Sequence, residues 1–520
     1  MSRRTRLALA AALMAAPSCA NDRDDAGSAT SDADTTASTA TAVDYTPVYA
    51  TVPCDGELFQ GRFPEDVALD GVECGTLTVP ENRTVTDGRD VTMPVAILRS
   101  AAAEKQPDPY VYFSGGPGDA GIEAGGRLLA AGLTPTDRDF IWFDQRGTGR
   151  SEPSLSCPEV QENTYDRYET TGTPAEEDEA TMVAVRSCFE DLRSRADLDS
   201  YDTPTIAQDV ADLREALGVD EWNIFGISYG TTVALEVLRS HPEGVRSAVI
   251  DSVYPPTVRN DFRAYAQLGE DAFERLYEAC AADEACNSAY PTLEQDVTDV
   301  AAALDEKPYR LTFTDPTGAE RVANLTGQDI VDAAYFAMYR AELIPLLPLF
   351  VQQLKSGNYS PLDLVAEDLL GALSGIADGV WHSVECADRL ETMQPADIDE
   401  LRDEYPLFGE FLAAPVYPDF CEELDLEPVD DAFRDVPATE IPTLVMAGEL
   451  DPVTPAEQAA ATAEQLGDAA TYIEFPGIGH GATPSSECGI EVFRSFLADP
   501  GAAPDTTCVD EMTGPAWATS

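Results

Sequence analysis

The chain has 520 residues, of which 95 are aspartate or glutamate and 32 are lysine or arginine, so its formal net charge is −63. Such an acidic protein repels phosphate backbones and anionic lipid, and we therefore expect no nucleic-acid partner. A hydrophobic content of 44% and a length sufficient for a large core indicate a globular protein rather than a disordered or fibrous one.

The N-terminal segment has the features of a targeting sequence. It begins with the basic run "MSRRTR" and continues with "LALAAALMAA", which is apolar but too short to span a bilayer. We therefore predict a signal peptide over residues 1–20 and an exported mature chain that is secreted, periplasmic or anchored at the cell surface. Cys19 leaves a lipid anchor open, because "APSC" partly resembles the lipobox of bacterial lipoproteins, and we expect no other attachment to a membrane. Residues 21–45 are rich in Asp, Ser, Thr and Ala without apolar periodicity and predict a disordered linker.

Ten cysteines follow Cys19, and an even number suits the oxidising compartment that a signal peptide implies. The sequence leaves their connectivity open, and we expect neighbours along the chain to pair because short loops close at the least entropic cost. The predicted disulfides are Cys54–Cys74, Cys157–Cys188, Cys280–Cys286, Cys386–Cys421 and Cys488–Cys508. No metal or cofactor is expected, since the chain has no Cys-x-x-Cys pair and only three histidines.

Strand and helix patterns alternate from residue 46 to residue 254. Residues 75–100 alternate apolar and polar side chains around an Asp-Gly turn at 87 and 88, as an antiparallel hairpin does. The apolar runs "PYVYFSGG" (109–116) and "DFIWFDQRG" (139–147) predict buried strands. Residues 205–219 have the apolar spacing of a helix capped by Thr205 and Gly218, and the strand "EWNIFGIS", a second helix and the strand "SAVIDSV" follow. This order predicts an α/β fold, in which helices cover both faces of a mostly parallel sheet.

Residues 255–435 interrupt this alternation. Their patterns are mostly helical, as in "AFERLYEACAAD" and "LIPLLPLFVQQL", with one hairpin at "YRLTFTDPTGAERVANL". The strand pattern resumes in "IPTLVMAGELD" (441–451), which a helix and "ATYIEFPGIGH" follow. We therefore predict a large helical cap over residues 255–435, inserted between strands of one sheet. Residues 46–254 are then the first part of the core and residues 436–520 its C-terminal part.

The stretch "NIFGISYGTTVAL" (223–235) places Ser228 between a predicted strand and a predicted helix. A serine on such an elbow is held outward, and the small Gly226 and Gly230 allow the chain to turn that tightly. A serine hydroxyl needs a base, usually histidine, and the base needs a carboxylate that fixes its tautomer. We therefore predict that Ser228 is a nucleophile rather than a turn residue, with an acid and then a histidine later in the chain.

Three histidines are available as the base. His241 lies near the end of the helix after the nucleophile and should point away from it, and His382 lies in the inserted segment before the sheet resumes. His480, in "FPGIGHGA", follows a strand-end carboxylate in the required order. For the acid, "AGELDPVTP" offers Glu449 and Asp451 at the carboxyl end of a strand, where such sheets place their sites. We favour Asp451, because a Pro-containing turn follows it and would hold it facing the site.

The oxyanion of an acyl-transfer intermediate needs two backbone N–H donors. One is expected from Tyr229, the residue after the nucleophile, and the other from the glycine loop "SGGPGDAG" (114–121). Within this loop we favour Gly116 and keep Gly115 as the alternative.

These motifs resemble those of the secreted α/β-hydrolases related to prolyl iminopeptidase and to the tripeptidyl aminopeptidases of actinomycetes. The resemblance extends from about Cys74 to Cys508 and rests on "FSGGPG", "DQRGTGRS", "GISYGT", "GELDPVTP" and "PGIGHG". It implies an α/β-hydrolase fold and the release of N-terminal residues through a Ser-His-Asp acyl-enzyme mechanism, without metal or cofactor. One departure is Ser114, which stands where the peptidase branch usually has histidine before the two glycines.

The resemblance also implies that the inserted helices cover the site and that their acidic side chains hold the amino terminus of a peptide. "SVECAD" resembles a stretch of the tripeptidyl branch, which makes Glu385 and Asp388 candidates for binding a substrate ammonium. The alternative is that both are surface charges beside the Cys386 disulfide.

We therefore predict an exported serine aminopeptidase, acting as a monomer, that releases N-terminal residues or tripeptides from peptides. A carboxylesterase for small esters would use the same residues without needing a free amine. A binding protein built on the same scaffold would be expected to have a broken triad, whereas this triad is complete. The geometry of the cap decides how many residues are released and which ones.

Overall fold

The structure is a computed structural model that describes residues 44–63, 71–133, 137–170, 174–259, 261–315, 318–362, 375–390, 398–408 and 418–519. The predicted signal peptide, Cys19 and residues 21–43 of the predicted linker lie outside the described residues. Everything described below belongs to one unit, Val43–Ser520.

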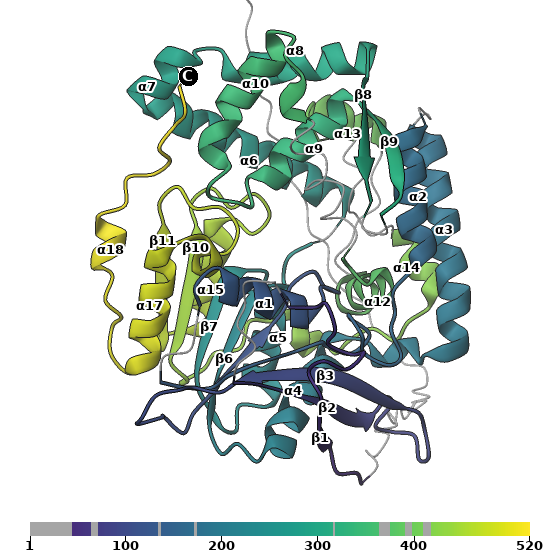
Figure 1. Cartoon of the computed structure of the whole chain (residues 1–520), viewed down its shortest axis with the longest axis vertical. Helices are drawn as coiled ribbons and strands as arrows, with labels where there is room; N and C mark the ends of the chain where they lie inside the picture. The colour runs from purple at the N-terminus through teal and green to yellow at the C-terminus, as the bar shows by residue number, and fades with distance from the viewer. Residues whose placement is uncertain are drawn as a thin grey trace, which may run out of the picture. The chain divides into compact units, whose positions relative to one another are not determined.

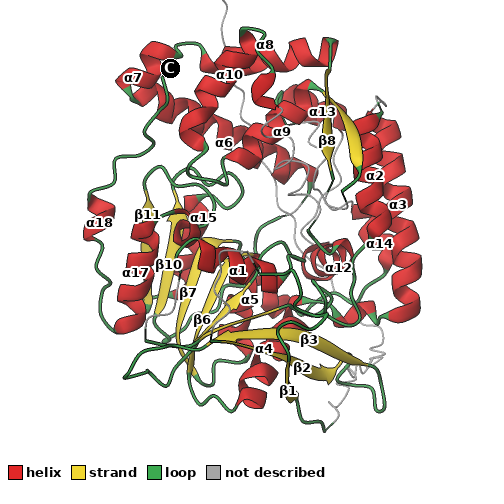
Figure 2. Ribbon diagram, viewed as in Figure 1, coloured by secondary structure: helices red, strands yellow, loops and turns green. Residues whose placement is uncertain are grey.

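Nine strands form the central sheet, in the order β1-β2-β3-β5-β4-β6-β7-β10-β11 (Figures 1 and 2). The strands are β1 (Val48–Val52), β2 (Val72–Pro80), β3 (Asp90–Leu98), β4 (Tyr110–Phe113), β5 (Phe140–Phe143), β6 (Trp222–Ser228), β7 (Val245–Val253), β10 (Thr443–Gly448) and β11 (Ala470–Phe475). Pairing is antiparallel from β1 through β3 to β5 and parallel between all neighbours from β5 to β11. The carboxyl ends of the parallel strands therefore meet at one edge, where α/β sheets place their sites.

Helices cover both faces of this sheet. Those that lie outside the segment between β7 and β10 are α1 (Gly121–Ala130), α2 (Pro158–Glu169), α3 (Pro174–Arg195), α4 (Thr203–Leu217), α5 (Tyr229–Ser240), α15 (Ala456–Leu466), α16 (Ala482–Ser485), α17 (Glu487–Ala498) and α18 (Thr507–Asp510). Alternate residues of a strand face opposite sides of a sheet. Val111 and Phe113 of β4 pack in the same hydrophobic cluster as α4, α5 and α15, whereas Tyr110 and Tyr112 pack in that of α1 and α17. The predicted α/β architecture is confirmed.

Helix α4 shows how local sequence sets the limits of an element. The Asp202 carboxylate accepts a hydrogen bond from the backbone N–H of Thr205 at 2.7 Å and caps the first turn. Gly218 ends the helix with φ +65°, a left-handed conformation that glycine adopts without strain. The end predicted at Gly218 is confirmed. The cap predicted at Thr205 is wrong, because the helix already begins at Thr203 and the side chain of Asp202 satisfies its first turn.

The segment between β7 and β10 is mostly helical and contains one hairpin. Its described elements are α6 (Phe262–Ala282), α7 (Glu284–Ala289), α8 (Leu293–Glu306), β8 (Tyr309–Thr314), β9 (Glu320–Leu325), α9 (Gly327–Ala337), α10 (Leu347–Lys355), α12 (Asp378–Arg389), α13 (Ile398–Glu404) and α14 (Pro418–Leu424). β8 and β9 pair antiparallel, and they share a separate hydrophobic cluster with α6, α8, α9 and α10. Figure 1 shows α6, α8, α9, α10, β8 and β9 in teal and green at the top of the view, with the sheet below them. Among the helices that the structure describes, none combines the length and the apolar character needed to cross a membrane.

Two parts of the chain cross the predicted limits of the cap. Helices α12 and α14 lie within residues 255–435, but Val384 and Phe420 pack in the hydrophobic cluster of the sheet. Helix α2 lies before the sheet strand β6, but Tyr165 and Tyr168 pack in the cluster of the inserted helices. The hydrophobic cluster of the inserted helices therefore includes residues from an earlier stretch of the chain, and α12 and α14 pack with the sheet.

Five disulfides join the ten cysteines in neighbouring pairs: Cys54–Cys74, Cys157–Cys188, Cys280–Cys286, Cys386–Cys421 and Cys488–Cys508. Each closes a short loop and contributes about 2–4 kcal/mol to stability. The Cys386 bridge ties α12 to α14, and the Cys488 bridge ties the C-terminal tail to α17.

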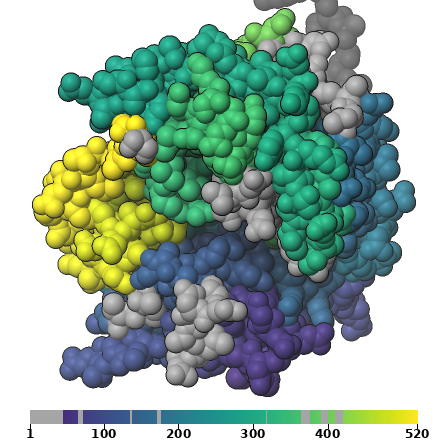
Figure 3. Space-filling view, turned by 45° about the horizontal axis from the view of Figure 1, so that its top comes forward, coloured from purple at the N-terminus to yellow at the C-terminus, as the bar shows by residue number. Residues whose placement is uncertain are grey.

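The C-terminal tail returns from the sheet to the inserted segment. The hydroxyl of Tyr290 donates to the carbonyl of Ala518 at 2.7 Å, and the N–H of Ala518 donates to the carbonyl of Pro345 at 3.0 Å. Trp517 packs against the cluster of the inserted helices. Figure 3 shows the yellow C-terminal residues beside the teal and green residues of the inserted segment. The tail therefore runs along the surface from the sheet to the inserted segment.

Candidate active site

Ser228 ends β6 and α5 begins at the next residue, so the serine occupies a strand-to-helix elbow. Its backbone has φ +58° and ψ −128°, which is strained for a residue with a side chain. The flanking glycines make the turn feasible. A Cβ at Gly226 would lie 2.1 Å from the carbonyl oxygen of Gly230, and a Cβ at Gly230 would lie 2.1 Å from that of Phe113. This close approach of backbones is the physical reason for the Gly-x-Ser-x-Gly spacing.

Asp451 and His480 lie side by side at the carboxyl end of the sheet. Asp451 follows β10, is fully buried, and accepts hydrogen bonds from the backbone N–H groups of Val453 and Thr454 at 3.0 and 2.9 Å. Nδ1 of His480 lies 2.9 Å from Oδ2 of Asp451. Because an ionised carboxylate only accepts hydrogen bonds, Nδ1 carries the proton and Nε2 is the acceptor nitrogen. This is the tautomer that a general base needs.

The pair changes the acidity of both side chains. Burial disfavours the charged imidazole, but the neighbouring Asp451 carboxylate outweighs burial and raises the pKa of His480 above its ordinary value of 6.5. Burial also disfavours the Asp451 carboxylate, but the charge and the hydrogen bond of His480 outweigh it and lower the pKa of Asp451. The carboxyl therefore stays ionised at neutral pH and can stabilise an imidazolium.

Two side chains at the end of β7 hold the loop that carries His480. The hydroxyl of Ser252 accepts the backbone N–H of Gly481 at 2.7 Å, and Asp251 accepts those of the next two residues at 2.9 and 2.7 Å. Strand β7 is the neighbour of β6, and a Cβ at Gly481 would lie 3.7 Å from Cγ2 of Ile227, the residue before the nucleophile. The histidine loop, residues 476–481, is thereby held beside the elbow.

The glycine loop, residues 114–121, passes beside Ser228. A Cβ at Gly115 would lie 3.0 Å from Cβ and 3.4 Å from Oγ of Ser228, so this backbone passes directly beside the serine. Gly116, the next residue, has φ +107°, which only glycine adopts readily. Tyr229 opens α5 immediately after the serine. Tyr229 and Gly115 therefore lie next to Ser228, and Gly116 is the next residue along the loop after Gly115.

Ser114 takes part in holding the glycine loop. It is buried, its hydroxyl donates to the carbonyl of Asp119 at 3.1 Å, and it accepts a hydrogen bond from Nε2 of Gln145 at 3.2 Å. Gln145 also donates to the carbonyl of Ser114 at 3.1 Å. The residue that departs from the peptidase pattern thus connects the two ends of the loop.

The alternative bases and the alternative acid lie elsewhere. Glu449 is exposed and accepts the backbone N–H of Gly477 at 2.7 Å. His241 follows the last residue of α5, at the opposite end of that helix from the nucleophile. His382 lies on α12 with its ring 5.9 Å from that of Phe189. The structure therefore brings Asp451 and His480 together and separates these three side chains from them.

Glu385 and Asp388 are both fully buried on α12. Asp388 accepts a hydrogen bond from the hydroxyl of Thr203 at 2.6 Å, whereas Glu385 accepts one from Tyr254 at 3.3 Å and pairs with Arg389 at 3.2 Å. The alternative that they are surface charges is wrong. Helix α12 packs in the hydrophobic cluster of the sheet, and the binding of a substrate ammonium by Glu385 or Asp388 stays a prediction.

Sequence patterns missed two contacts of the histidine. The hydroxyl of Thr454 donates to Oδ2 of Asp451 at 2.7 Å and lies 3.2 Å from Nδ1 of His480. Tyr339, just after α9, accepts the backbone N–H of His480 at 3.2 Å, and the two rings are 4.8 Å apart. Thr454 stands three residues after the acid, a turn spacing that could have indicated it. Tyr339 has no such signal, because it comes from the inserted segment.

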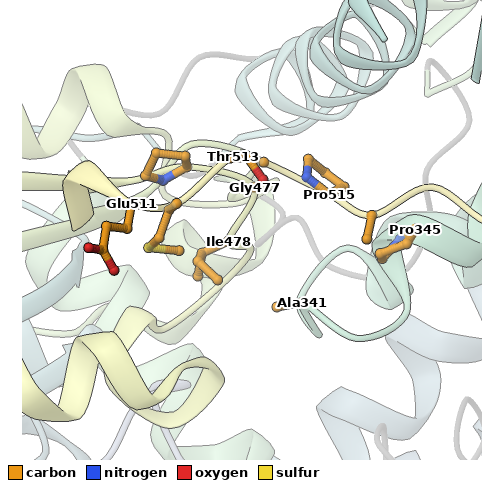
Figure 4. A pocket seen from close by; sticks show the side chains of 11 residues that line it. Ala341, Pro345, Gly477, Ile478, Glu511, Thr513 and Pro515 are labelled. Atoms are coloured by element: carbon orange, nitrogen blue, oxygen red, sulfur yellow. The ribbon is translucent and has the colours of Figure 1, made fainter. Parts of the chain in front are cut away.

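A pocket of about 330 Å³ lies beside the histidine loop (Figure 4). Three parts of the chain line it: Ala341 and Pro345 of the inserted segment, Pro476, Gly477 and Ile478 of the histidine loop, and residues 511–516 of the tail. Neither the elbow serine nor the Asp451–His480 pair contributes to the lining. Within the described ranges, no group of three His, Cys, Asp or Glu side chains is placed to hold a metal ion.

Comparison with known proteins agrees with this geometry. The chain is 27% identical over 352 residues to the tripeptidyl aminopeptidase of Streptomyces coelicolor, and the match covers 62% of each chain, less than two thirds of the length of that relative. It is 26% identical over 466 residues to the serine protease Hip1 of Mycobacterium tuberculosis, covering 82% of this chain and 84% of that one. It is also 26% identical over 464 residues to carboxylesterase B of Mycobacterium tuberculosis, covering 84% and 85%.

A family model described as the alpha/beta hydrolase fold matches residues 109–483. The matched region contains the glycine loop, the elbow serine, the acid and the histidine. The chain therefore belongs to the α/β-hydrolase fold family.

Proposed function

We propose that this protein is an exported, monomeric serine hydrolase that releases N-terminal residues or tripeptides from peptides. The observation that carries the proposal is the 2.9 Å hydrogen bond between His480 and Asp451, in a loop held beside the strained elbow of Ser228. A nucleophile, a base and an acid then occupy the carboxyl end of the sheet in the chain order of this fold.

In the proposed mechanism, Nε2 of His480 takes the proton of Ser228 as Oγ attacks the carbonyl carbon of the substrate. The backbone N–H groups of Tyr229 and Gly116 stabilise the oxyanion that forms. The imidazolium then gives its proton to the leaving amine, and an acyl-enzyme remains. His480 activates a water molecule that releases the acyl group, and Asp451 stabilises the imidazolium in both steps without taking its proton. These steps need no metal and no cofactor.

The choice of peptide as substrate rests on similarity. The "GGPG" loop (115–118) is typical of the peptidase branch, and relatives named tripeptidyl aminopeptidase and serine protease are similar to this chain. A carboxylesterase is the second candidate, because a relative named carboxylesterase B is similar over 84% of the chain. Both reactions use the same acyl-enzyme, so the substrate and not the triad distinguishes them.

Export is supported by the chemistry of the chain. The ten paired cysteines suit an oxidising compartment, and the N-terminal segment has a basic and then an apolar run. A lipid on Cys19 would hold the mature protein at a membrane. Mass spectrometry of the N-terminal peptide of the mature chain tests this anchor directly, since diacylglycerol adds a defined mass to that cysteine.

Three chromogenic amides and one ester test the activity. They are a free-amine prolyl amide, a free-amine tripeptidyl amide, the same tripeptidyl amide with an acetylated amine, and a p-nitrophenyl ester. Cleavage of a free-amine amide but not of the acetylated one establishes an aminopeptidase. Cleavage of the ester alone would show a competent triad and overturn the peptidase assignment.

Ser228→Ala tests the nucleophile. Removing the nucleophile of such a triad lowers kcat by about 10⁶-fold, so activity should fall to background while the thermal unfolding transition is unchanged. Ser240→Ala is the matched control, because it removes a hydroxyl from the other end of α5, and it should keep activity within about threefold. Retained activity in Ser228→Ala would contradict the proposal.

A further inference from the structure

A buried chain of hydrogen bonds connects α12 to the residue after the nucleophile. The hydroxyl of Tyr229 lies 2.7 Å from Oγ1 of Thr203, and Oγ1 donates to Oδ2 of Asp388 at 2.6 Å. All three side chains are fully buried. Because a threonine hydroxyl has one proton and gives it to Asp388, the phenol of Tyr229 must be the donor to Thr203.

The arrangement joins three elements that are distant in the sequence. Tyr229 is the first residue of α5, Thr203 is the first residue of α4, and Asp388 lies in the last turn of α12. The backbone N–H of Thr203 adds a long contact of 3.4 Å to Oδ1 of the same carboxylate. A buried polar group is unfavourable unless its hydrogen bonds are satisfied, and here every link is satisfied inside the protein. The ring of Tyr229 is therefore fixed at its far end.

The other end of α12 is attached to the glycine loop. Ala377, the residue before the first turn of α12, donates its N–H to the carbonyl of Gly118 at 3.0 Å, and Asp119 forms a bridge with Ile376. A Cβ at Gly118 would lie 2.8 Å from the carbonyl oxygen of Ala377, so the two backbones are in direct contact. One helix is thus linked to both segments from which oxyanion donors are expected: to the glycine loop directly and to Tyr229 through Thr203.

We propose that Thr203 and Asp388 are positioning residues of the oxyanion hole: they anchor the phenol of Tyr229 and thereby orient its backbone N–H toward the developing oxyanion. This rests on the proposed serine hydrolase function. Neither residue touches the substrate. They act through Tyr229, while the N-terminal end of α12 fixes the glycine loop that carries Gly116.

The physical reason is that oxyanion stabilisation depends steeply on geometry. A backbone N–H is effective only within hydrogen-bonding distance of the place where negative charge develops, and loss of one such donor lowers kcat by about 10²–10³-fold. The Ser228 backbone is strained, so the residue that follows needs support from outside the elbow. Without the chain of hydrogen bonds, Tyr229 can rotate with the first turn of α5 and move its N–H.

The test replaces the middle link by an isosteric residue. Thr203→Val removes the hydroxyl and keeps the shape, and Thr203→Ser keeps the hydroxyl. Thr203→Val should lower kcat for a p-nitrophenyl ester by about 10- to 100-fold with little change in KM, because the affected interaction exists only in the transition state. Thr203→Ser should stay within about threefold of the original enzyme. Thr462→Val, which removes another buried hydroxyl on α15, is the matched control and should leave kcat unchanged.

Two further measurements separate positioning from a general loss of structure. Phenylboronic acid accepts the serine oxygen and forms a tetrahedral adduct, and its affinity should fall by the same factor as kcat/KM in Thr203→Val. Tyr229→Phe, which removes only the phenol oxygen, should reproduce the loss, and the double variant should be no slower than either single one. Tyr229→Phe also serves if Thr203→Val does not fold.

Unchanged kcat in both single variants would overturn the proposal. So would a fall in kcat without a fall in boronate affinity, or losses that multiply in the double variant. These outcomes are distinct from failure of the proposed function. If Ser228→Ala keeps its ester hydrolysis, the serine hydrolase itself is refuted, whereas an inactive Ser228→Ala with a fully active Thr203→Val refutes only the positioning role.

Discussion

Two histidines occupy different regions of this molecule: His480 is partly buried, with its side chain 12% exposed, whereas His382 is buried. His480 lies at the carboxyl end of the sheet, with its Nδ1 2.9 Å from a carboxylate oxygen of Asp451. His382 lies on α12 between the rings of Phe189 and Phe420, at centroid distances of 5.9 and 5.3 Å, and its Nδ1 has no hydrogen-bond partner among the described residues.

The difference in surroundings reverses the effect of burial. Burial alone lowers the pKa of His382 to about 4, so this ring is neutral but a weak base. Burial acts in the same direction on His480, but the Asp451 carboxylate outweighs it and raises that pKa. A histidine therefore needs a carboxylate neighbour to act as a base at neutral pH, because burial alone lowers its pKa too far.

The largest expected effect comes from removing that neighbour. Asp451→Asn keeps the shape of the side chain but lets its amide donate to Nδ1, which moves the histidine proton to Nε2. The wrong tautomer cannot accept the serine proton, and kcat should fall by about 10⁴-fold. Steady-state hydrolysis of a p-nitrophenyl ester at pH 8 measures this loss.

Glu449→Gln is the control for that variant, since Glu449 was the alternative acid and contacts only the backbone of Gly477 in the histidine loop among the described hydrogen bonds. Glutamine still offers an oxygen to that N–H, so activity should fall less than about fivefold. A larger loss in Glu449→Gln than in Asp451→Asn would contradict the assignment of the acid.

His382 should make the folded protein less stable in acid, and replacing it should leave catalysis unchanged. Its pKa is about 4 in the folded protein and 6.5 for an ordinary histidine, so below pH 6.5 the unfolded chain binds a proton that the folded one does not. At pH 4.5 this lowers the free energy of unfolding by about 2.5 kcal/mol. The free energy of unfolding, measured with urea, should fall between pH 7 and pH 4.5. In His382→Leu this fall should be smaller than in the original protein by about 2.5 kcal/mol. An equal pH dependence in both proteins would refute the prediction.

The sheet and the candidate residues Ser228, Asp451 and His480 could be predicted from the sequence because their signals are local. Strand and helix patterns alternate along the parallel sheet, and the backbone contacts of Gly226 and Gly230 impose a spacing around Ser228 that can be read directly. The order of serine, acid and histidine then selects Asp451 and His480 from a chain with three histidines. The disulfide pairs could also be predicted from the sequence, because neighbouring cysteines close short loops.

The residues around the site could not be predicted from local sequence patterns, because their positions depend on how distant segments of the chain pack together. The helical patterns of residues 255–435 do not show that one of these helices, α12, packs against the sheet. That packing buries Glu385 and Asp388, which resemblance had suggested for substrate binding. Thr203 and Tyr339 carry no motif, and their contacts with Asp388 and with the histidine loop exist only after the fold forms.

Removing the hydroxyl of Thr454, which contacts Asp451, should lower activity less than changing Asp451 itself. This hydroxyl donates to Oδ2 of Asp451, and Thr454→Val would leave that carboxylate with two backbone N–H donors and the histidine. We expect kcat to fall by about tenfold, corresponding to the loss of one hydrogen bond to a charged group. Thr454→Ser should restore most of the activity. Equal activity of the valine and serine variants would show that the hydroxyl has no part in orienting the acid.

The smallest effect is the position of the acidic limb of the pH profile. His480 must be neutral to accept the serine proton, so kcat/KM should rise with pH as the ring loses its proton. Burial lowers the pKa of this ring, but the charge and the hydrogen bond of Asp451, with a further contribution from the charge of Asp251, raise it above 6.5 overall. The midpoint of the limb should therefore lie above 6.5 in low salt. A midpoint below 6.5 would mean that His480 behaves like His382, with burial dominating and the carboxylate too weak to make it an effective base.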